Sequence, residues 1–266
     1  MNTATPAAAL LEVDGRAVRV DLQAAHDLAI VQDFNGAQPH WFTAPEPRSI
    51  PLHTARFSGR VNAGASCNCS TLSITPHCDG THTEGAGHLT AEALAVRTVV
   101  PIGFLPALLL SVCPVAQAGD LLITAEGLAA AWPVAPLFAP RALVLRTLPN
   151  TPLKCVQDYR TQPAAFFALG AAQWLVTRGI EHLVLDLPSA DRADDGGHLY
   201  AHREFFGLPA GATALTAVRR PQCTITELAY IDSAVPDGAY LLCLQIPALG
   251  GDALPSRPVL FPVRPA

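Results

Sequence analysis

Apolar and polar positions alternate along this chain in short runs that are typical of β-strands. Residues 10–22 (LLEVDGRAVRVDL) alternate on both sides of Asp14-Gly15, a pair that favours a tight hairpin turn. Residues 71–75 predict a strand that leads into a polar, histidine-rich stretch. Longer apolar runs predict buried strands at 94–102, 107–113, 142–148, 182–188, 223–231 and 239–247, the last two closing the chain.

Helical spacing of apolar residues occurs in three places. The clearest is 163–178, which begins at Pro163 and ends at Arg178-Gly179, a typical stop. Shorter helices are predicted at 125–132 and 198–208. Because helices alternate with buried strands, we expect an α/β fold: a single domain, residues 1–266, with a mixed, barrel-like β-sheet core flanked by helices.

Two segments need separate interpretation. Residues 23–66 are rich in proline, and a loop that long in a compact domain is usually functional, as a lid or a pocket wall. Within it, Trp41 and Phe42 would either wall an aromatic pocket or pack in the core. Residues 99–119 carry no charge and reach the length of a membrane span, but three prolines interrupt them. We therefore expect two buried strands with proline-containing connections and no membrane association.

The composition excludes several classes of function. The net charge is −5, and the lack of any run rich in lysine or arginine argues against a nucleic-acid partner. The N-terminal stretch lacks the positive charges of a signal peptide. Seven cysteines are an odd number, scattered without the spacing of a disulfide framework. Together these features predict a cytoplasmic protein with reduced thiols.

The candidate chemistry lies in residues 76–90, PHCDGTHTEGAGHLT. If this stretch is extended, side chains alternate between its faces, so Cys78, His82 and Glu84 share one face. His88 would reach the same place by a turn at the neighbouring glycines. Thiolate, imidazole and carboxylate are the usual protein ligands of zinc, and three ligands with one open position are typical of catalytic sites. The pattern therefore predicts a catalytic metal site.

The window 78–88 (CDGTHTEGAGH) resembles the signature of the cyclase superfamily, H-x-G-T-H-x-D-x-P-x-H, which includes kynurenine formamidase and isatin hydrolase. The Gly-Thr-His core and the final histidine match. Cys78, Glu84 and Ala86 stand where the family has His, Asp and Pro. His77 is one position out of register, so we give it no ligand role. Weaker similarities cover most of the chain in the family order, at 20–22, 183–191, 201–207 and 224–228.

The resemblance implies the swivelling β/β/α fold of the family, a small-molecule substrate, and a homodimer or homotetramer. The implied metal ligands are Cys78, His82 and Glu84 from the motif, with His202 and Glu227 completing a second metal position. Glu227 lies in an apolar strand where an unpaired carboxylate is costly, so pairing with an arginine is its alternative role. Asp186 would either support the site or cap the end of its strand.

The chemistry that the resemblance implies is hydrolysis of an amide-type carbon–nitrogen bond by a metal-activated water, with His88 as general acid/base. Cys78 and Glu84 would make the metal shell softer and less positive than two histidines and an aspartate. We therefore expect zinc rather than manganese, and one or two ions. The amide, formamide or cyclic amide that is the substrate stays open.

Other functions are compatible with the same residues. Cys78 could be a nucleophile, with His82 or His88 as its base and no metal. The substituted shell could instead retain a structural zinc ion, or bind a small molecule without turnover. His198 lies one helical turn before His202 and competes with it for a place in the site.

Overall fold

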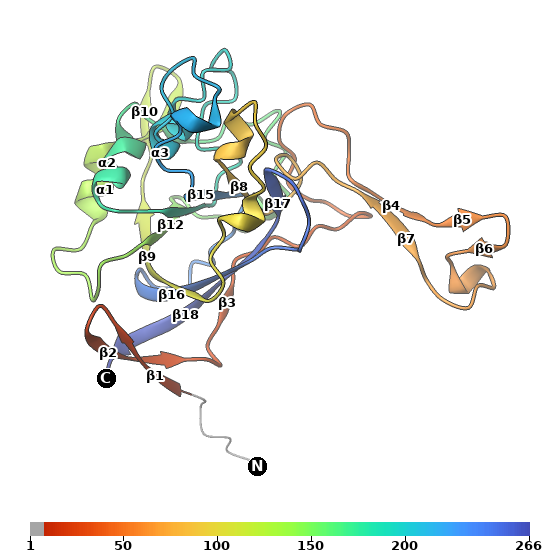
Figure 1. The fold of residues 1–266 in the computed structure, drawn as a ribbon, viewed down its shortest axis with the longest axis horizontal. Coiled ribbons are helices and arrows are strands. Elements are labelled where there is room, and N and C mark those ends of the chain that lie inside the picture. Colours follow the sequence, from red (N-terminus) through yellow and green to blue (C-terminus); the bar gives the residue numbers. More distant parts are fainter. Residues whose placement is uncertain (1–7) are drawn as a thin grey trace.

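The centre of the molecule is a large mixed β-sheet, seen in a computed structural model that describes residues 8–266 (Figure 1). Four neighbouring strands, β9, β12, β14 and β15, are parallel, and antiparallel strands extend both sides. The strand order is β1-β2-β18-β16-β9-β12-β14-β15-β8-β17, with β3 paired to β18. Residues 1–7, the start of the N-terminal stretch discussed above, lie outside the described residues.

The elements have the following bounds. The main sheet consists of β1 (Ala8–Val13), β2 (Arg16–Asp21), β3 (His26–Asp27), β8 (His82–Gly85), β9 (Phe104–Val112), β12 (Ala142–Thr147), β14 (His182–Leu185), β15 (Thr224–Glu227), β16 (Gly238–Gln245), β17 (Ala253–Pro255) and β18 (Arg257–Pro265). Smaller sheets are formed by β4 (Arg48–Pro51) with β7 (Ser70–Ser73), β5 (His53–Thr54) with β6 (Phe57–Ser58), and β10 (Val115–Gln117) with β11 (Asp120–Ile123) and β13 (Phe166–Phe167). The α-helices are α1 (Ala125–Ala131), α2 (Ala171–Thr177) and α3 (Tyr200–Phe206).

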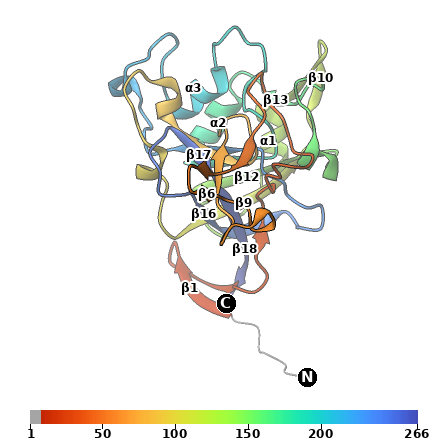
Figure 2. The same cartoon turned by 90° about the vertical axis from the view of Figure 1, so that its right-hand side faces the viewer.

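The three helices cover one face of the parallel strands (Figure 2). Because strand side chains alternate between faces, Leu108 and Leu110 of β9 pack with the helices, while Leu109 packs in a second core on the opposite face. Phe205 of α3 and Leu175 of α2 are fully buried in the helical layer. This layer fixes α3 close to the carboxyl ends of the parallel strands, where β14 and β15 end.

Most of the predicted elements are confirmed. The hairpin at 10–22, the helices at 125–132 and 198–208, and a mixed sheet flanked by helices are all present. Of the predicted strands, those at 71–75, 107–113, 142–148, 182–188, 223–231 and 239–247 are found, with shifted ends.

Four details of the prediction are wrong. Residues 94–102 form the short 3-10 helix η3 (Val96–Thr98) and irregular chain, not a strand. The helix predicted at 163–178 is only α2, because Gly170 has φ +80°, which an α-helix does not accommodate, and the chain before it forms β13. In the window 78–88, only residues 82–85 are extended. Finally, β17 and β18 follow the segment expected to close the chain.

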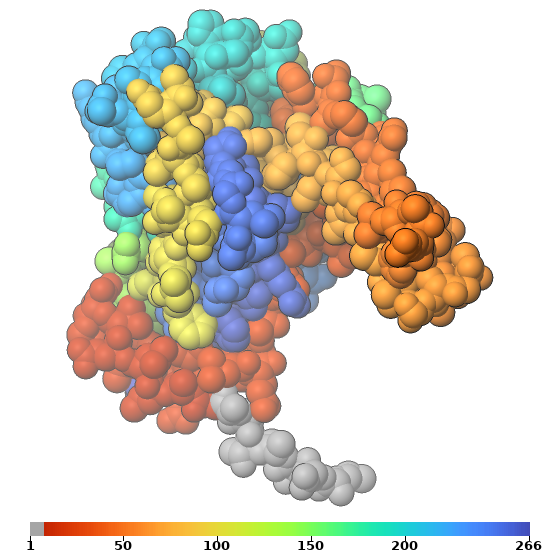
Figure 3. All heavy atoms as spheres, turned by 45° about the vertical axis from the view of Figure 1, so that its right-hand side comes forward, coloured from red at the N-terminus to blue at the C-terminus, as the bar shows by residue number. Residues whose placement is uncertain are grey.

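One segment projects from the body of the molecule (Figures 1 and 3). Residues 47–74 contain β4, β5, β6 and β7, and we call them the arm. In the arm, β4 pairs with β7 and β5 pairs with β6, and these strands form sheets separate from the main one. Within residues 8–266, no helix has the length and apolar character needed to cross a membrane. All seven cysteines, which lie in this described part, are unpaired.

Candidate metal centre

The candidate site lies where β8 and β15 pair beside α3. In this antiparallel pair His82 stands directly opposite Glu227, and Glu84 lies two residues further along β8 on the same face. His202 reaches the site from α3, and its ring nitrogen Nε2 lies 2.7 Å from Oε1 of Glu84. Residues from three segments that are distant in sequence thus come together in one buried place, because the sheet register and the helical layer hold them there.

The turn before β8 sets the orientation of His82. Gly80 has φ +75°, the left-handed conformation that glycine adopts without strain, and its carbonyl oxygen accepts a hydrogen bond from Nδ1 of His82 at 3.1 Å. A carbonyl can only accept, so the proton resides on Nδ1. In the neutral imidazole the other nitrogen, Nε2, then carries a free lone pair, which is the form of histidine that binds a cation.

A carboxylate orients His202 in the same way. Oδ2 of Asp191 lies 2.5 Å from Nδ1 of His202, and the two oxygens of Asp191 also accept hydrogen bonds from the backbone amides of Ala201 and His202. The ring nitrogen Nε2 faces Glu84 and lies 3.5 Å from Oε1 of Glu227. A histidine held by a carboxylate on one nitrogen is a common arrangement around metal sites.

Glu227 is fixed at the end of β15. Its Oε1 accepts a hydrogen bond from the backbone amide of Ala190 at 2.7 Å, and its Oε2 lies 3.6 Å from Nε2 of His82. The next residue, Leu228, has φ +52°, which is a strained conformation for a leucine. Strained backbone is concentrated at functional sites in proteins, and here it lies directly beside the glutamate.

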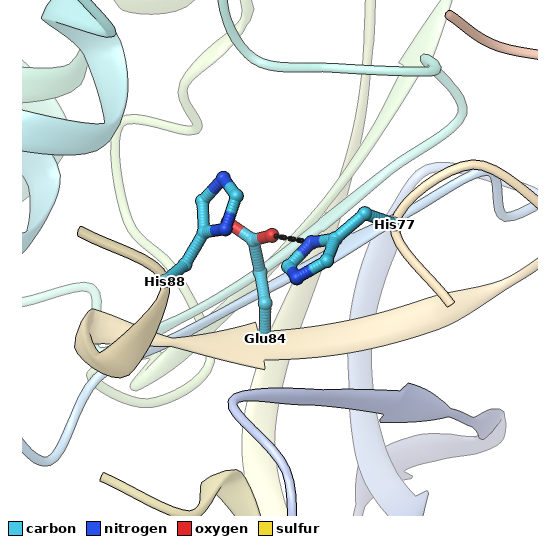
Figure 4. A group of neighbouring side chains, drawn as sticks. All are labelled: His77, Glu84 and His88. Carbon is cyan, nitrogen blue, oxygen red and sulfur yellow. Dashed lines mark hydrogen bonds and ion pairs between the residues drawn. The ribbon is translucent and has the colours of Figure 1, made fainter. Parts of the chain in front are cut away.

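Two further histidines, His77 and His88, lie on either side of the Glu84 carboxylate (Figure 4). Nδ1 of His77 lies 2.8 Å from Oε2 of Glu84, and Nε2 of His77 lies 2.9 Å from Oδ2 of Asp252. His88 packs against His77 with ring centroids 4.1 Å apart, and its Nδ1 lies 3.6 Å from Oδ2 of Asp252. His88 is carried by the short 3-10 helix η2 (Ala86–Leu89), where a side chain at Gly87 would clash with the carbonyl oxygen of Leu94.

The charges of these residues are strongly coupled. Burial alone would raise the pKa of Glu84, but the nearby His88 and His202 outweigh it and hold this pKa well below its usual range. Burial alone would lower the pKa of His77, but hydrogen bonds to Asp252 and Glu84 raise it to about 10. The hydrogen bond from His77 is the main effect that holds the pKa of Asp252 well below its usual range, and the nearby His88 lowers this pKa further. Glu84 and Asp252 are thus kept ionised.

The structure brings most of the predicted site residues together. In residues 8–266, two groups have ligand atoms within 4.8 Å of one another: His82, Glu84 and Glu227 form one, and His77, Glu84 and His88 form the other. Glu84 belongs to both. His202 lies against the first group, whereas the competing His198 is exposed and stacks on Tyr200.

The expected set of metal ligands differs from the structure at His77, and the structure does not test the role of Cys78. Cys78 is buried and lines a cavity that opens onto the site, but its sulfur belongs to neither group, so its role as a ligand stays a prediction. His77, which the register of the motif had left out, contacts Glu84 directly. Asp252, 175 residues further along the chain, had no signal in the local sequence. Asp186 does not reach this site. Its carboxylate accepts a hydrogen bond from the backbone amide of Thr147, at the end of β12, and forms an ion pair with Lys154.

A cavity of about 470 Å³ opens onto these residues. Its walls include the site residues Glu84, His88 and His202, the polar loop at 192–197, and Trp41 and Phe42 from the long N-terminal loop. The expectation that this loop contributes a pocket wall is therefore confirmed. Phe42 is 60% exposed, which excludes the alternative of core packing for this residue. The volume is in the range of small-molecule binding sites.

The donor atoms fit a divalent cation. Nε2 of His82, Oε1 of Glu84 and Nε2 of His202 are all buried, yet each lacks a hydrogen-bond partner. Buried polar atoms without partners are rare and costly in proteins. The last two atoms lie 2.7 Å apart as an ion pair, although their contact does not meet the geometry of a hydrogen bond. Imidazole nitrogens and carboxylate oxygens are the ligand types that zinc binds.

Comparison with known proteins agrees with this architecture. A family model described as Putative cyclase matches residues 15–192, two thirds of the chain. The chain belongs to the cyclase family. The matched region contains the motif with His82, Glu84 and His88, whereas His202 and Glu227 lie beyond it. A comparison with curated proteins finds no match for this chain.

Solved structures with a similar fold include three from bacteria. A predicted metal-dependent hydrolase from Bacillus stearothermophilus is 20% identical, with a TM-score of 0.59, and the alignment covers 89% of this chain and 97% of that one. Isatin hydrolase A from Labrenzia aggregata is 13% identical, with a TM-score of 0.57, and the alignment covers 89% of this chain and 93% of that one. For isatin hydrolase A from Ralstonia solanacearum the identity is 14% and the TM-score 0.57, and the alignment covers 89% of this chain and 91% of that one. These similarities establish the cyclase-family fold across most of the chain.

Proposed function

We propose that this cyclase-family protein is a metal-dependent hydrolase that cleaves the carbon–nitrogen bond of an amide, formamide or cyclic amide. The observation that carries the proposal is the convergence of three buried ligand atoms without hydrogen-bond partners, on His82, Glu84 and His202, beside a cavity of small-molecule size. The family membership and the fold of the metal-dependent and isatin hydrolases support the same reading. A cytoplasmic location, inferred from the sequence, belongs to the proposal.

His82, Glu84, His202 and Glu227 would hold the metal ion, for which we propose zinc. Such an ion would supply Lewis acidity, which activates a water molecule and polarises the carbonyl group of the substrate. The second group, His77, Glu84 and His88, shares Glu84 with the first and could hold a second ion. We favour His77 over Cys78 as the additional ligand, because its Nδ1 already lies 2.8 Å from Glu84.

The remaining chemistry falls to the protein side chains. His88 lies at the cavity, is about a quarter exposed, and is within reach of the carboxylate of Asp252. It is therefore suited to carry a proton to the leaving nitrogen as the bond breaks. Trp41 and Phe42 would bind the apolar part of the substrate and limit access of bulk water to the reacting carbonyl.

The metal-free alternative, in which Cys78 is the nucleophile, receives less support. Burial, together with the charges of Asp79 and Glu227, raises the pKa of the Cys78 thiol to about 11. A nucleophilic cysteine needs the opposite environment, one that favours the thiolate at neutral pH.

The test is hydrolysis of a panel of formamides, lactams and cyclic imides, measured before and after removal of metal by a chelator. We expect turnover of at least one nitrogen-containing substrate, loss of it on chelation, and recovery on addition of zinc. His88→Gln should reduce turnover while the ion held by His82, Glu84, His202 and Glu227 is retained, because His88 is proposed to move a proton. Turnover that is insensitive to chelation but abolished by alkylation of Cys78 would contradict the proposal in favour of the thiol mechanism.

A further inference from the structure

A second, smaller cavity lies beside the one that opens onto the metal centre. Its volume is about 270 Å³, and we call it the side cavity. The two cavities share part of their walls, because Trp41 and residues 192–194 line both of them. A molecule that lies across Trp41 and this loop therefore extends from the metal centre into the side cavity.

The side cavity has an aromatic wall that is held in place. Beside Trp41 it contains Tyr159 and Phe166, together with Ala164. Phe166 belongs to β13, which pairs with β11. Tyr159 is buried, and its backbone amide donates to the carbonyl oxygen of His40 at 2.9 Å, which joins its segment to the loop that carries Trp41. Because both sides of this wall are fixed, the cavity is formed before any ligand binds.

The charged groups around the side cavity already have partners. Nε of Arg192 lies 3.1 Å from Oδ1 of Asp120, and its Nη1 donates to the backbone carbonyl of Asp194 at 2.7 Å. The carboxylate of Asp191 is bound to His202 and to two backbone amides of α3. Asp194 is exposed, so water solvates its charge. A charged ligand group would gain little here, whereas an uncharged aromatic group would bury apolar surface against the rings of the wall.

We propose that the substrate of this protein has two parts: the amide that is cleaved at the metal centre, and a distal, uncharged aromatic group that occupies the side cavity. This inference rests on the proposed function and narrows its substrate to amides and cyclic amides that carry a second aromatic ring. Trp41 lies at the junction of the two cavities, so its ring contacts the substrate between these parts. The side cavity adds binding and takes no part in bond cleavage, so its contribution should appear in KM and not in kcat.

Matched pairs of substrates test the proposal. Formanilide, oxindole and phthalimide are each compared with a derivative that carries a benzyloxy group on the ring, so the bond to be cleaved stays the same within a pair. In each pair that the zinc-loaded wild type turns over, we expect a KM about 10-fold lower for the extended member and a similar kcat, because burial of the second ring strengthens binding.

Substitutions in the wall of the side cavity give the second comparison. Ala164→Trp fills part of the cavity and should bring the KM ratio of each pair close to one. Ala164→Leu intrudes less and should reduce the KM difference in part, so a result is available even where the tryptophan variant fails to fold. Ala129→Trp is the matched control, since Ala129 is an exposed alanine of α1 and its replacement should keep the wild-type ratio. A general loss of activity would affect both members of a pair alike and leave the ratio unchanged.

The outcomes separate this inference from the function on which it rests. Hydrolysis with equal KM values within every pair, or a KM ratio that both substitutions of Ala164 leave at the wild-type value, would overturn the inference and leave the proposed function standing. If the zinc-loaded wild type hydrolyses none of these compounds, the inference fails together with the proposed cleavage of carbon–nitrogen bonds.

Discussion

Nε2 of His202 and Oε1 of Glu84 lie 2.7 Å apart in the buried centre of the molecule, yet neither atom makes a hydrogen bond. Each residue is nevertheless firmly held by its other atoms: His202 by Asp191, and Glu84 by His77. Side chains fixed in this way, with one donor atom left open, are prepared for a ligand that arrives from outside the chain.

Asp252 should support the metal centre although it is not a proposed ligand. Its Oδ2 accepts from His77 and lies close to His88, so it orients both rings. Asp252→Asn should weaken zinc binding by roughly 10- to 100-fold, the usual effect of losing a carboxylate that orients a ligand. Competition with a chromogenic chelator measures this, and Glu12→Gln, at an exposed site, is the charge-matched control. Equal affinities for the two variants would show that Asp252 has no part in the site.

A substitution of Cys78 distinguishes a metal site with a sulfur ligand from one without it. If the ion is held by histidines and glutamates, Cys78→Ala should retain stoichiometric metal and most of the hydrolytic activity, because its sulfur belongs to neither ligand group. The metal content and the hydrolytic activity of Cys78→Ala are measured beside those of Cys223→Ala, a control at a buried cysteine elsewhere in the chain. Loss of metal in Cys78→Ala alone would establish the sulfur as a ligand, as the motif alignment predicts.

His182 should make stability depend on pH. It is buried on β14 against Thr224, and burial lowers its pKa from 6.5 to about 4. Between these values the unfolded chain binds more protons than the folded one, so stability falls as the pH falls through this window and is constant above it. From about pH 7 to about pH 5 this residue should account for a loss of about 2 kcal/mol in the free energy of unfolding.

Urea denaturation of wild type and His182→Gln at both pH values isolates this contribution. The variant lacks the titrating imidazole, so its stability should change less over the same interval. Identical pH dependence of the two proteins would mean that the imidazole of His182 titrates normally in the folded state.

The only lysine of the chain should be important for stability. Nζ of Lys154 is buried and donates to Oδ2 of Asp186 at 2.7 Å and to both oxygens of Thr147. Lys154→Met leaves the buried carboxylate without its partner, and such losses cost about 3–5 kcal/mol. Adding Asp186→Asn should then recover part of the loss. A double-mutant cycle by urea denaturation measures this coupling, and strict additivity of the two substitutions would contradict it.

The sequence was sufficient for the local part of the site. His82 and Glu84 are two residues apart on a real strand, so period-two reasoning placed them correctly on one face. His77 was left out because it is one position out of register with the family motif. In the structure the chain turns at Gly80, with φ +75°, and this turn returns His77 to Glu84. A one-residue difference in register therefore changed the candidate ligand.

Contacts made over long distances in sequence were harder to predict. Nothing in the local pattern indicates that Asp252 reaches His77, because the contact depends on β17 pairing with β8. His202 and Glu227 were found only through the family resemblance, since neither lies in a distinctive spacing. The helix predicted from residue 163 was shortened by Gly170, whose left-handed conformation is not evident from the apolar periodicity around it.

Metal stoichiometry of the purified protein tests the central claim most directly. Wild type, incubated with zinc and freed of excess ion, should retain at least one equivalent per chain by elemental analysis. His202→Ala and Glu84→Ala should lose most of it, whereas His198→Ala, at the exposed histidine of the same segment, should bind like wild type. A folded wild-type protein that holds no stoichiometric metal, or a His202→Ala variant that binds as fully as His198→Ala, would contradict the account.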